Sequence, residues 1–445
     1  MSAGAAWRAI GWVGVAAILS CSSAGGNGEN LTPQTGGSGG SAGNQGDASV
    51  LPDGNFLDAS QQDGQVNAKT VLKGKVVAPE GTIPISGALV YVTASNPAAI
   101  PAAVYCDKCV KLGAETPYTT TKADGTFELP TWKTGNVKLV VQKGQFRRVR
   151  SLEVIEEGEQ DVPLELTTLP GRMDKANGDD IPKMAIVPGA WDRIDVSLAK
   201  LGLAKITGKT ALGGIKVDYA TAGFDYYQPD NPLNFSDPKQ PSVFLKNQQA
   251  LDGYNIIFFP CDGNTGEQEW CTGSLATTGE VRDNLRSWVA KGGKLYVTDF
   301  SYEFVRQLFP DYISWQGETD TIGSACQHGS WDAPADVKDQ GLQDWLTAMS
   351  ISNWNVEANW TTITGVHPVA TEDMDGNPVT VTPKVWVEGM GPSTVSFERS
   401  CGRVLFSTYH TEADKGSETE LLPQEKALLY ILLEVAVCVA PPNVY

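Results

Sequence analysis

The stretches YNIIFFPCDG (residues 254–263) and WVAKGGKLYVTDF (288–300) carry the strongest indication of fold in this chain. Residues 254–259 and 294–298 are short apolar runs typical of buried strands. Between them, Leu285, Trp288 and Val289 recur at helical spacing, and the following Gly-Gly pair is a typical helix end. A strand, a helix and a strand in this order predict two parallel strands joined by a right-handed crossover.

The same alternation extends on both sides of this unit. Residues 184–189 and 216–219 read as strands with a helical pattern at 192–201 between them, and a strand at 403–407 precedes a helix at 424–438. We therefore predict an α/β domain over 181–440, built on a mostly parallel sheet with flanking helices.

The part of the chain before this domain has a different pattern of hydrophobic and turn residues. Residues 70–168 contain short β-branched runs at 71–77, 87–92, 125–129, 137–141 and 160–166, separated by turn residues such as Asp124-Gly125. This spacing predicts an all-β sandwich. The fold class is thus multidomain, with the sandwich followed by the α/β domain. The polar connection at 167–182 predicts that the two domains unfold independently.

Three motifs in the first domain have a known counterpart. The segments GKVV (74–77), ISGALV (85–90) and TKADGTFEL (121–129) resemble the carboxypeptidase regulatory-like domain, a prealbumin-type sandwich, in order and spacing. The resemblance implies a spacer or interaction module without catalytic residues.

The second domain resembles the class I glutamine amidotransferase-like fold in YNIIFFPCDG, in WVAKGGKLYVTDF and in CGRVLFSTYHTE (401–412). That family uses a cysteine nucleophile on the turn after the strand that follows the Gly-Gly pair, together with a downstream His-x-Glu. His410 and Glu412 match the second element, but the turn at 298–302 has no cysteine. The resemblance therefore implies a non-catalytic relative. The alternative is an envelope hydrolase that uses Cys261 or Ser301 with His410.

A ligand is expected at the carboxyl ends of the parallel strands, where open α/β sheets bind their ligands. Carboxylates and aromatic rings gather there in the sequence, and they suit a sugar or a cation. A glycan or an envelope protein is the expected partner. We expect no cofactor and no metal ion. The candidate binding rim consists of Trp191, Asp192, Asp262, Asp299, Tyr302, Glu303, His410 and Glu412.

The N-terminus predicts export and lipid attachment. Residues 1–20 have an apolar run too short to span a bilayer, as in a signal peptide. Its end, Ile18-Leu19-Ser20-Cys21, resembles a lipobox, which implies lipidation of Cys21 with palmitate among the acyl chains; the alternative is an ordinary cleaved signal. By resemblance to the sorting signals of enterobacterial lipoproteins, Ser22 in place of Asp implies the outer membrane or the cell surface rather than the inner membrane. Residues 21–68 are rich in Gly and Ser and predict a disordered tether.

Charge excludes some partners. The chain has 34 Lys and Arg against 52 Asp and Glu, a formal net charge of −18. Basic residues are neither in excess nor clustered, which argues against nucleic acid and against direct docking on anionic lipid. We expect membrane attachment through the lipid only.

Eight cysteines in an exported chain predict disulfide bonds. With Cys21 set aside for the lipid, short spacing suggests the pairs Cys106 with Cys109 and Cys261 with Cys271. Cys401 with Cys438 could join the last strand to the last helix, which leaves Cys326 without a partner. Zinc is the alternative for Cys106 and Cys109, although a second pair of ligands with metal-site spacing is absent from the sequence.

Overall fold

The computed structural model describes residues 68–106, 110–189, 191–211, 213–228, 234, 236–261, 271, 274–326, 329–373, 375–411 and 417–433. The described residues belong to one compact unit. The predicted signal peptide, Cys21 and the tether up to residue 67 lie outside the described residues, as do Cys109, Asp262, Glu412 and Cys438. Among the described helices, none is long and apolar enough to cross a membrane.

An eight-stranded sheet forms the centre of the α/β part. Its first five strands are parallel, and the last three are antiparallel to their neighbours. The predicted parallel α/β sheet is therefore present within a mixed sheet. The strand order is β12 (Phe224–Tyr226), β9 (Met184–Ile186), β13 (Ile256–Phe259), β14 (Lys294–Thr298), β24 (Gly402–Ser407), β23 (Pro392–Arg399), β22 (Lys384–Glu388) and β17 (Asp336–Val337).

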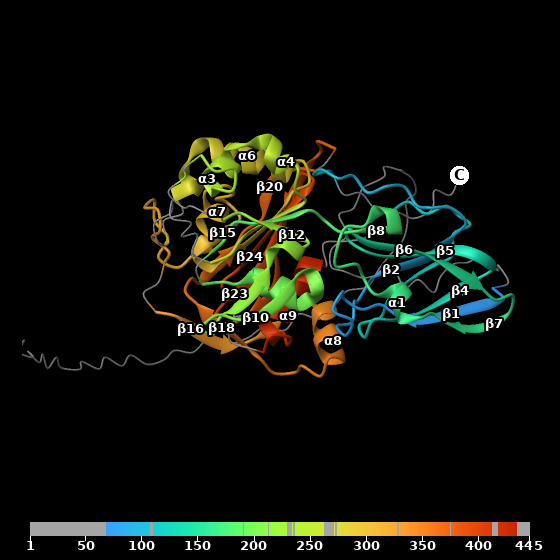
Figure 1. Cartoon of the computed structure of the whole chain (residues 1–445). Helices are drawn as coiled ribbons and strands as arrows, with labels where there is room; N and C mark the ends of the chain where they lie inside the picture. The colour runs from blue at the N-terminus through green and yellow to red at the C-terminus, as the bar shows by residue number, and fades with distance from the viewer. Residues whose placement is uncertain are drawn as a thin grey trace, which may run out of the picture. The chain divides into compact units, whose positions relative to one another are not determined.

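Helices cover both faces of this sheet (Figure 1). One face packs against α3 (Pro241–Lys246), α4 (Gln248–Asp252), α6 (Gly279–Ala290) and α7 (Glu303–Arg306), and the other against α2 (Ile194–Leu198) and α9 (Pro423–Leu433). Alternate residues of β13 divide between the two cores, because successive strand residues point to opposite faces. Ile257 and Phe259 lie in the first core, and Ile256 and Phe258 in the second.

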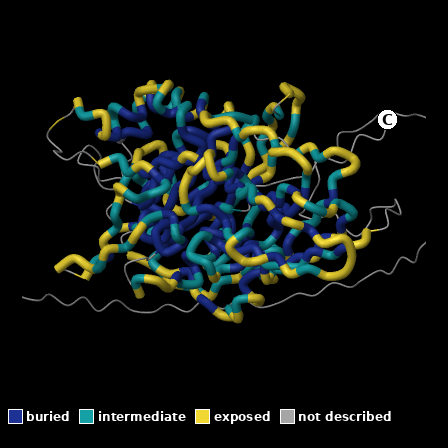
Figure 2. Tube along the Cα trace, turned by 45° about the vertical axis from the view of Figure 1, so that its right-hand side comes forward, coloured by how far each residue is buried: buried dark blue, intermediate teal, exposed yellow. Residues whose placement is uncertain are grey.

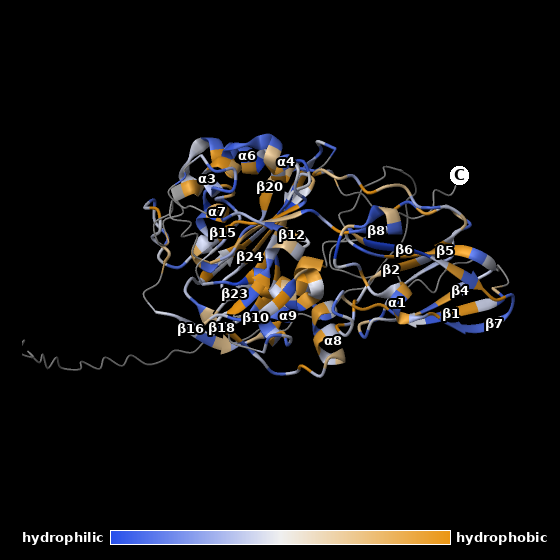
Figure 3. Cartoon of the chain, in the orientation of Figure 1, coloured by the Kyte–Doolittle hydropathy of each residue, from blue (hydrophilic) through white to orange (hydrophobic). Residues whose placement is uncertain are grey.

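The predicted stop after α6 is confirmed. Gly292 has a φ of +116°, and a side chain at Gly293 would overlap the ring of Trp288. Most residues of α9 are buried, and Figure 3 shows this helix as largely hydrophobic. Figure 2 shows buried residues concentrated in the middle of the unit, as expected for a sheet with both faces covered.

One strand of the prediction is misplaced. Residues 216–219 overlap β11 (Ile215–Asp218), which pairs with β10 (Lys205–Lys209) in a separate antiparallel ribbon. The sheet edge is formed instead by β12. Lys216 and Asp218 alternate with Val217, a pattern that suits a half-exposed ribbon better than a parallel strand covered on both faces.

The N-terminal part contains two sheets. Leu72, Phe127 and Leu129 from the first and Val90 and Leu139 from the second belong to one hydrophobic core. The sheets have the orders β4-β1-β7 and β3-β2-β5-β6-β8. Their strands are β1 (Thr70–Lys75), β2 (Leu89–Thr93), β3 (Tyr118–Thr120), β4 (Thr126–Thr131), β5 (Gly135–Lys143), β6 (Phe146–Val154), β7 (Gly158–Asp161) and β8 (Asp179–Asp180).

The segment between the two parts is packed, in contrast to the expectation of a loose connection. Leu169 and Ile181 are buried in the same core that contains Leu72 and Phe258. Trp345 also donates a hydrogen bond from Nε1 to the Pro84 carbonyl at 2.7 Å. Because one core includes residues of both parts, independent unfolding is no longer expected.

The remaining described elements are short connections, outer strands and one longer helix. They are α1 (Leu164–Thr167), η1 (Lys175–Asn177), η2 (Ala199–Leu203), η3 (Tyr219–Thr221), α5 (Ser274–Thr277), η4 (Asp299–Ser301), β15 (Ile313–Trp315), β16 (Trp331–Pro334), α8 (Gln340–Ala348), β18 (Asn355–Asn359), β19 (Ile363–Val366), β20 (Val369–Glu372) and β21 (Pro378–Val381).

The disulfide bonds join cysteines far apart in sequence. Cys106 pairs with Cys401 across 295 residues, and Cys271 pairs with Cys326 across 55. Cys261 is a free, buried thiol. All three predicted pairs are therefore wrong, including Cys401 with Cys438, and Cys326 has a partner. The prediction relied on short spacing and on the order of the last strand and helix, whereas the fold brings Cys106 beside the turn between β23 and β24. The disulfide at Cys106 also removes the zinc alternative.

Candidate functional site

Three chemically reactive side chains meet at the carboxyl edge of the parallel strands. Cys261 follows β13, Asp299 follows β14 and His410 follows β24. Their ligand atoms all lie within 4.8 Å of one another. His410 Nε2 is 2.8 Å from Asp299 Oδ2, and Cys261 Sγ is 3.9 Å from the same oxygen. Because the strands are parallel and adjacent, residues that follow them converge at one point.

Asp299 occupies the turn where the amidotransferase resemblance places the cysteine nucleophile. Its φ is +42°, a left-handed conformation that few residues other than glycine adopt, and asparagine and aspartate tolerate it better than most. The short helix η4 begins at the same residue. The sharp turn is thus present, and it presents a carboxylate instead of a thiol.

The Asp299 carboxylate is completely buried and hydrogen-bonded on both oxygens. Thr361 donates its hydroxyl to Oδ1 at 2.8 Å, and the Trp360 backbone N–H lies 3.2 and 3.1 Å from the two oxygens. Burial raises the pKa of Asp299, and the contacts with His410, Thr361 and Trp360 oppose that rise. These partners use the lone pairs with which a nucleophile would attack.

Cys261 is the free thiol of this cluster. Burial raises its pKa to about 12; the neighbouring His410 lowers it and Asp299 raises it further. Its side chain is 0% exposed. Since the thiolate and not the thiol is the nucleophile, Cys261 is unreactive as a nucleophile in this conformation.

A second buried carboxylate connects the same strand ends. Asp192 accepts hydrogen bonds from the Thr298 hydroxyl at 2.6 Å and from the Thr411 hydroxyl at 2.5 Å. Thr298 in turn accepts the backbone N–H of Cys261 at 2.8 Å. Asp192 therefore links the ends of β14 and β24 to the segment after β9, which is a structural role.

The predicted rim is largely enclosed. Asp192, Asp299, Tyr302, Glu303 and His410 are each at most 3% exposed, so in this structure they contact one another and the surrounding chain more than solvent. Glu303 forms an ion pair with Arg306 at 3.0 Å. Trp191 is the exception at 59% exposed, and Asp262 and Glu412 lie outside the described residues.

The covering segment explains this burial. Residues 359–361, at the end of β18, lie over the strand ends. There Asn359 accepts the Thr408 hydroxyl at 2.6 Å, and Trp360 and Thr361 contact Asp299. The sequence of this segment, Asn-Trp-Thr, carries no signal that it contacts residues 49 to 62 positions away in the chain. Its residues were therefore missed.

Comparisons with known proteins do not assign a family. No protein-family model matches the chain, and no curated protein matches it. Among solved structures, PurLQS from Thermotoga maritima is similar over 56% of this chain and 97% of its own, with 12% identity and a TM-score of 0.31. A putative ThuA-like protein from Bacteroides uniformis is similar over 56% of this chain and 88% of its own, with 11% identity and a TM-score of 0.28.

The state of Cys261 leads to a first prediction. With a pKa of about 12, only about one thiol in ten thousand is ionised at pH 8. We therefore expect iodoacetamide to modify Cys261 in the native protein at least about a hundredfold more slowly than in denaturant. Peptide mapping by mass spectrometry measures both rates. Rapid native modification would show an accessible thiolate and favour the hydrolase alternative.

Proposed function

We propose that this chain is an exported, lipid-anchored protein that binds a ligand or a protein partner without catalysing a reaction. The observation that carries this proposal is the state of the strand-end cluster: the turn expected to carry a nucleophile carries Asp299, which is buried and hydrogen-bonded on both oxygens.

The other two candidate nucleophiles support the same conclusion. Cys261 is buried, with a pKa raised to about 12. Ser301 is 2% exposed and donates its hydroxyl to the Pro260 carbonyl at 2.7 Å instead of to a base. Nucleophilic catalysis needs a group that is both activated and within reach of substrate, and neither side chain meets that requirement.

One observation favours the hydrolase alternative. Cys261, His410 and Asp299 supply the side chains of a cysteine–histidine–carboxylate triad and lie within 4.8 Å of one another. In that function Cys261 would be the nucleophile and His410 its base, oriented by Asp299. The alkylation rate of native Cys261 separates the two proposals.

Export is supported by the cysteines. Two disulfide bonds occur among the described residues, and such bonds persist in oxidising compartments. In this proposal residues 1–20 are a signal peptide, Cys21 carries the lipid and 21–68 separate the folded unit from the outer membrane. We further propose that the two N-terminal sheets form a carboxypeptidase regulatory-like sandwich that acts as a spacer or interaction module.

Lipid attachment gives the second prediction. The mature chain is expected to begin at Cys21 with acyl groups attached, because two or more acyl chains anchor a protein stably where one does not. Mass spectrometry of the N-terminal peptide and detergent phase partitioning measure this. Cys21→Ala should move the protein almost completely to the aqueous phase, and Ser23→Ala should leave partitioning unchanged. An unmodified mature N-terminus would mean an ordinary cleaved signal.

A further inference from the structure

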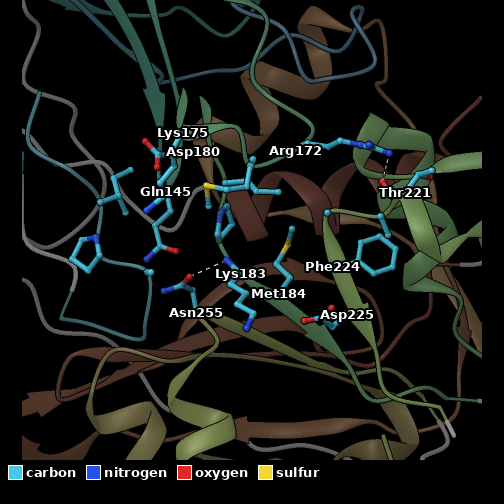
Figure 4. Close-up of a pocket in the computed structure, with 18 of the residues that line it drawn as sticks. Gln145, Arg172, Lys175, Asp180, Lys183, Met184, Thr221, Phe224, Asp225 and Asn255 are labelled. Carbon is cyan, nitrogen blue, oxygen red and sulfur yellow. Dashed lines mark hydrogen bonds between the residues drawn. The ribbon is translucent and has the colours of Figure 1, made fainter. Parts of the chain in front are cut away.

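A cavity of about 470 Å³ lies at the amino ends of the parallel strands, whereas the cysteine–aspartate–histidine cluster lies at their carboxyl ends. It is bordered by residues at the amino ends of β9 and β12, by Asn255 just before β13, and by the 100–102 segment of the N-terminal part (Figure 4). Its volume falls within the range of small-molecule sites in proteins.

Gln145 gives the clearest indication that this cavity binds a ligand. This residue lies in the turn between β5 and β6 and is only 4% exposed, yet its Oε1 has no hydrogen-bond partner among the described residues. It lines the cavity, as Figure 4 shows. A buried amide oxygen without a donor is unfavourable, so the site favours an occupant that supplies an N–H or O–H.

The charges around the cavity are mainly positive. Arg172, Lys175 and Lys183 line it, and none of the three forms an ion pair with any residue that the structure describes. Arg172 donates a hydrogen bond to the Thr221 carbonyl at 2.6 Å, and the Lys183 ammonium lies 4.5 Å from the centre of the Tyr254 ring. Of the two carboxylates, Asp180 is neutralised by Arg147 at 2.8 Å in a buried pair, which leaves Asp225 alone. Asp225 accepts a hydrogen bond from the Tyr254 hydroxyl at 2.6 Å and has no ion pair among the described residues. Three cations against this one carboxylate, in a chain of net charge −18, attract an anion.

The rest of the lining is apolar. Met184, Phe224 and Ile181 are buried there, and Ile100, Met173 and Ala222 add further apolar surface. A small inorganic anion would leave this surface in contact with water, whereas an organic anion with an apolar body would cover it.

We propose that this cavity binds a small amphipathic organic anion. Its apolar body contacts Met184 and Phe224, and a donor on it bonds to Gln145 Oε1. Its anionic group lies near Lys175 and draws the exposed Lys183 side chain away from the Tyr254 ring. The site lies away from the strand-end cluster and does not depend on whether that cluster is catalytic or on the lipid anchor.

A pair of matched probes tests the proposal on the full chain. The fluorescent anion anilinonaphthalene sulfonate has an apolar body, one N–H donor and a sulfonate, and phenylnaphthylamine has the same body and donor without the sulfonate. We expect the anion to bind at one saturable site and the neutral probe to bind about tenfold more weakly, since a charged hydrogen bond is lost. Fluorescence titration measures both. Equal affinities would overturn the proposal.

Three variants locate the binding. Lys183→Met removes an exposed charge and should lower the affinity for the anion about tenfold without changing the affinity for the neutral probe. The control Lys122→Met, on an exposed turn outside the cavity, should change neither affinity. Ala222→Phe, at a half-buried extended residue, should abolish binding of both by filling the space. Gln145→Met should weaken both and leave the melting temperature equal or higher, because it removes an unpaired buried oxygen.

Each result bears on the proposal. If Ala222→Phe and Lys183→Met both leave the affinity for the anion unchanged, the probe binds elsewhere and the proposal is wrong. If circular dichroism shows that Ala222→Phe is unfolded, Lys183→Met decides the question, since Lys183 is exposed and its replacement leaves the core intact. A destabilised Gln145→Met variant would mean that the amide has a structural partner and would count against a ligand role.

Discussion

Replacing Asp299 by alanine is expected to lower the free energy of unfolding by about 4 kcal/mol, which is typical for removing one partner of a buried charged network. The carboxylate is 0% exposed and accepts from the Thr361 hydroxyl and the Trp360 N–H while contacting the His410 ring. Alanine leaves these groups buried without partners. It is also a poorer residue than aspartate for the left-handed backbone at this position, where φ is +42°.

Urea unfolding followed by circular dichroism measures the loss. Asp299→Asn keeps the shape of the side chain and tolerates the backbone, so we expect it to cost about half as much. The exposed Asp320→Ala serves as a control and should change stability by less than about 0.5 kcal/mol. A well-folded Asp299→Ala protein that loses only ligand binding would contradict the structural role and restore the predicted binding rim.

The pH dependence of the same residue has a definite sign. Burial raises the pKa of Asp299 above its usual value of 3.8, so the folded protein binds this proton more tightly than the unfolded chain does. The protonated Asp299 side chain therefore contributes its full stabilisation at pH values below the pKa of the unfolded chain. That contribution is lost as the pH rises through the pKa of Asp299 in the folded protein. The difference in stability between the native protein and Asp299→Asn should accordingly be largest at acidic pH.

The sequence predicted those parts of the fold that depend on neighbouring residues. The strand–helix–strand unit at 256–298 followed from hydrophobic spacing and from the Gly292-Gly293 stop, and each of its elements is present. Strand β6 was not predicted, and three of its residues, Arg147, Arg148 and Arg150, carry charges that are unusual in a strand. Their charges are balanced at long range, by Asp179 and Asp180 of β8.

The sequence predicted which residues lie at the candidate site, but not that other segments cover and bury them. Motif order placed Asp299 and His410 at the strand ends, which is where the structure has them. Whether a strand end is open or covered depends on distant segments, here residues 359–361, and nothing in the local sequence reports that packing. The cavity that contains Gln145 was missed for the same reason, because its lining comes from segments between residues 100 and 255.

Removal of the Cys106–Cys401 disulfide is expected to lower the free energy of unfolding by about 5 kcal/mol. The bond closes a loop between residues 295 apart, and in the chain-entropy account a cross-link stabilises by restricting the unfolded chain, more for longer loops. It also links the N-terminal part to the turn after β23, across a unit whose core includes residues of both parts. We therefore expect one cooperative transition in the oxidised protein.

The matched comparison is between two double variants. Cys106→Ser with Cys401→Ser should cost about 5 kcal/mol, and Cys271→Ser with Cys326→Ser, across 55 residues, about 4 kcal/mol. Peptide mapping without reductant checks the pairing directly, since Cys106 should be linked to Cys401 and not to Cys109. If the first double variant keeps full stability, or if its loss is confined to a separate transition of the N-terminal part, the two parts are energetically independent. The buried Leu169 and Ile181 between them argue against that outcome, because exposing either part alone would expose the core that both share.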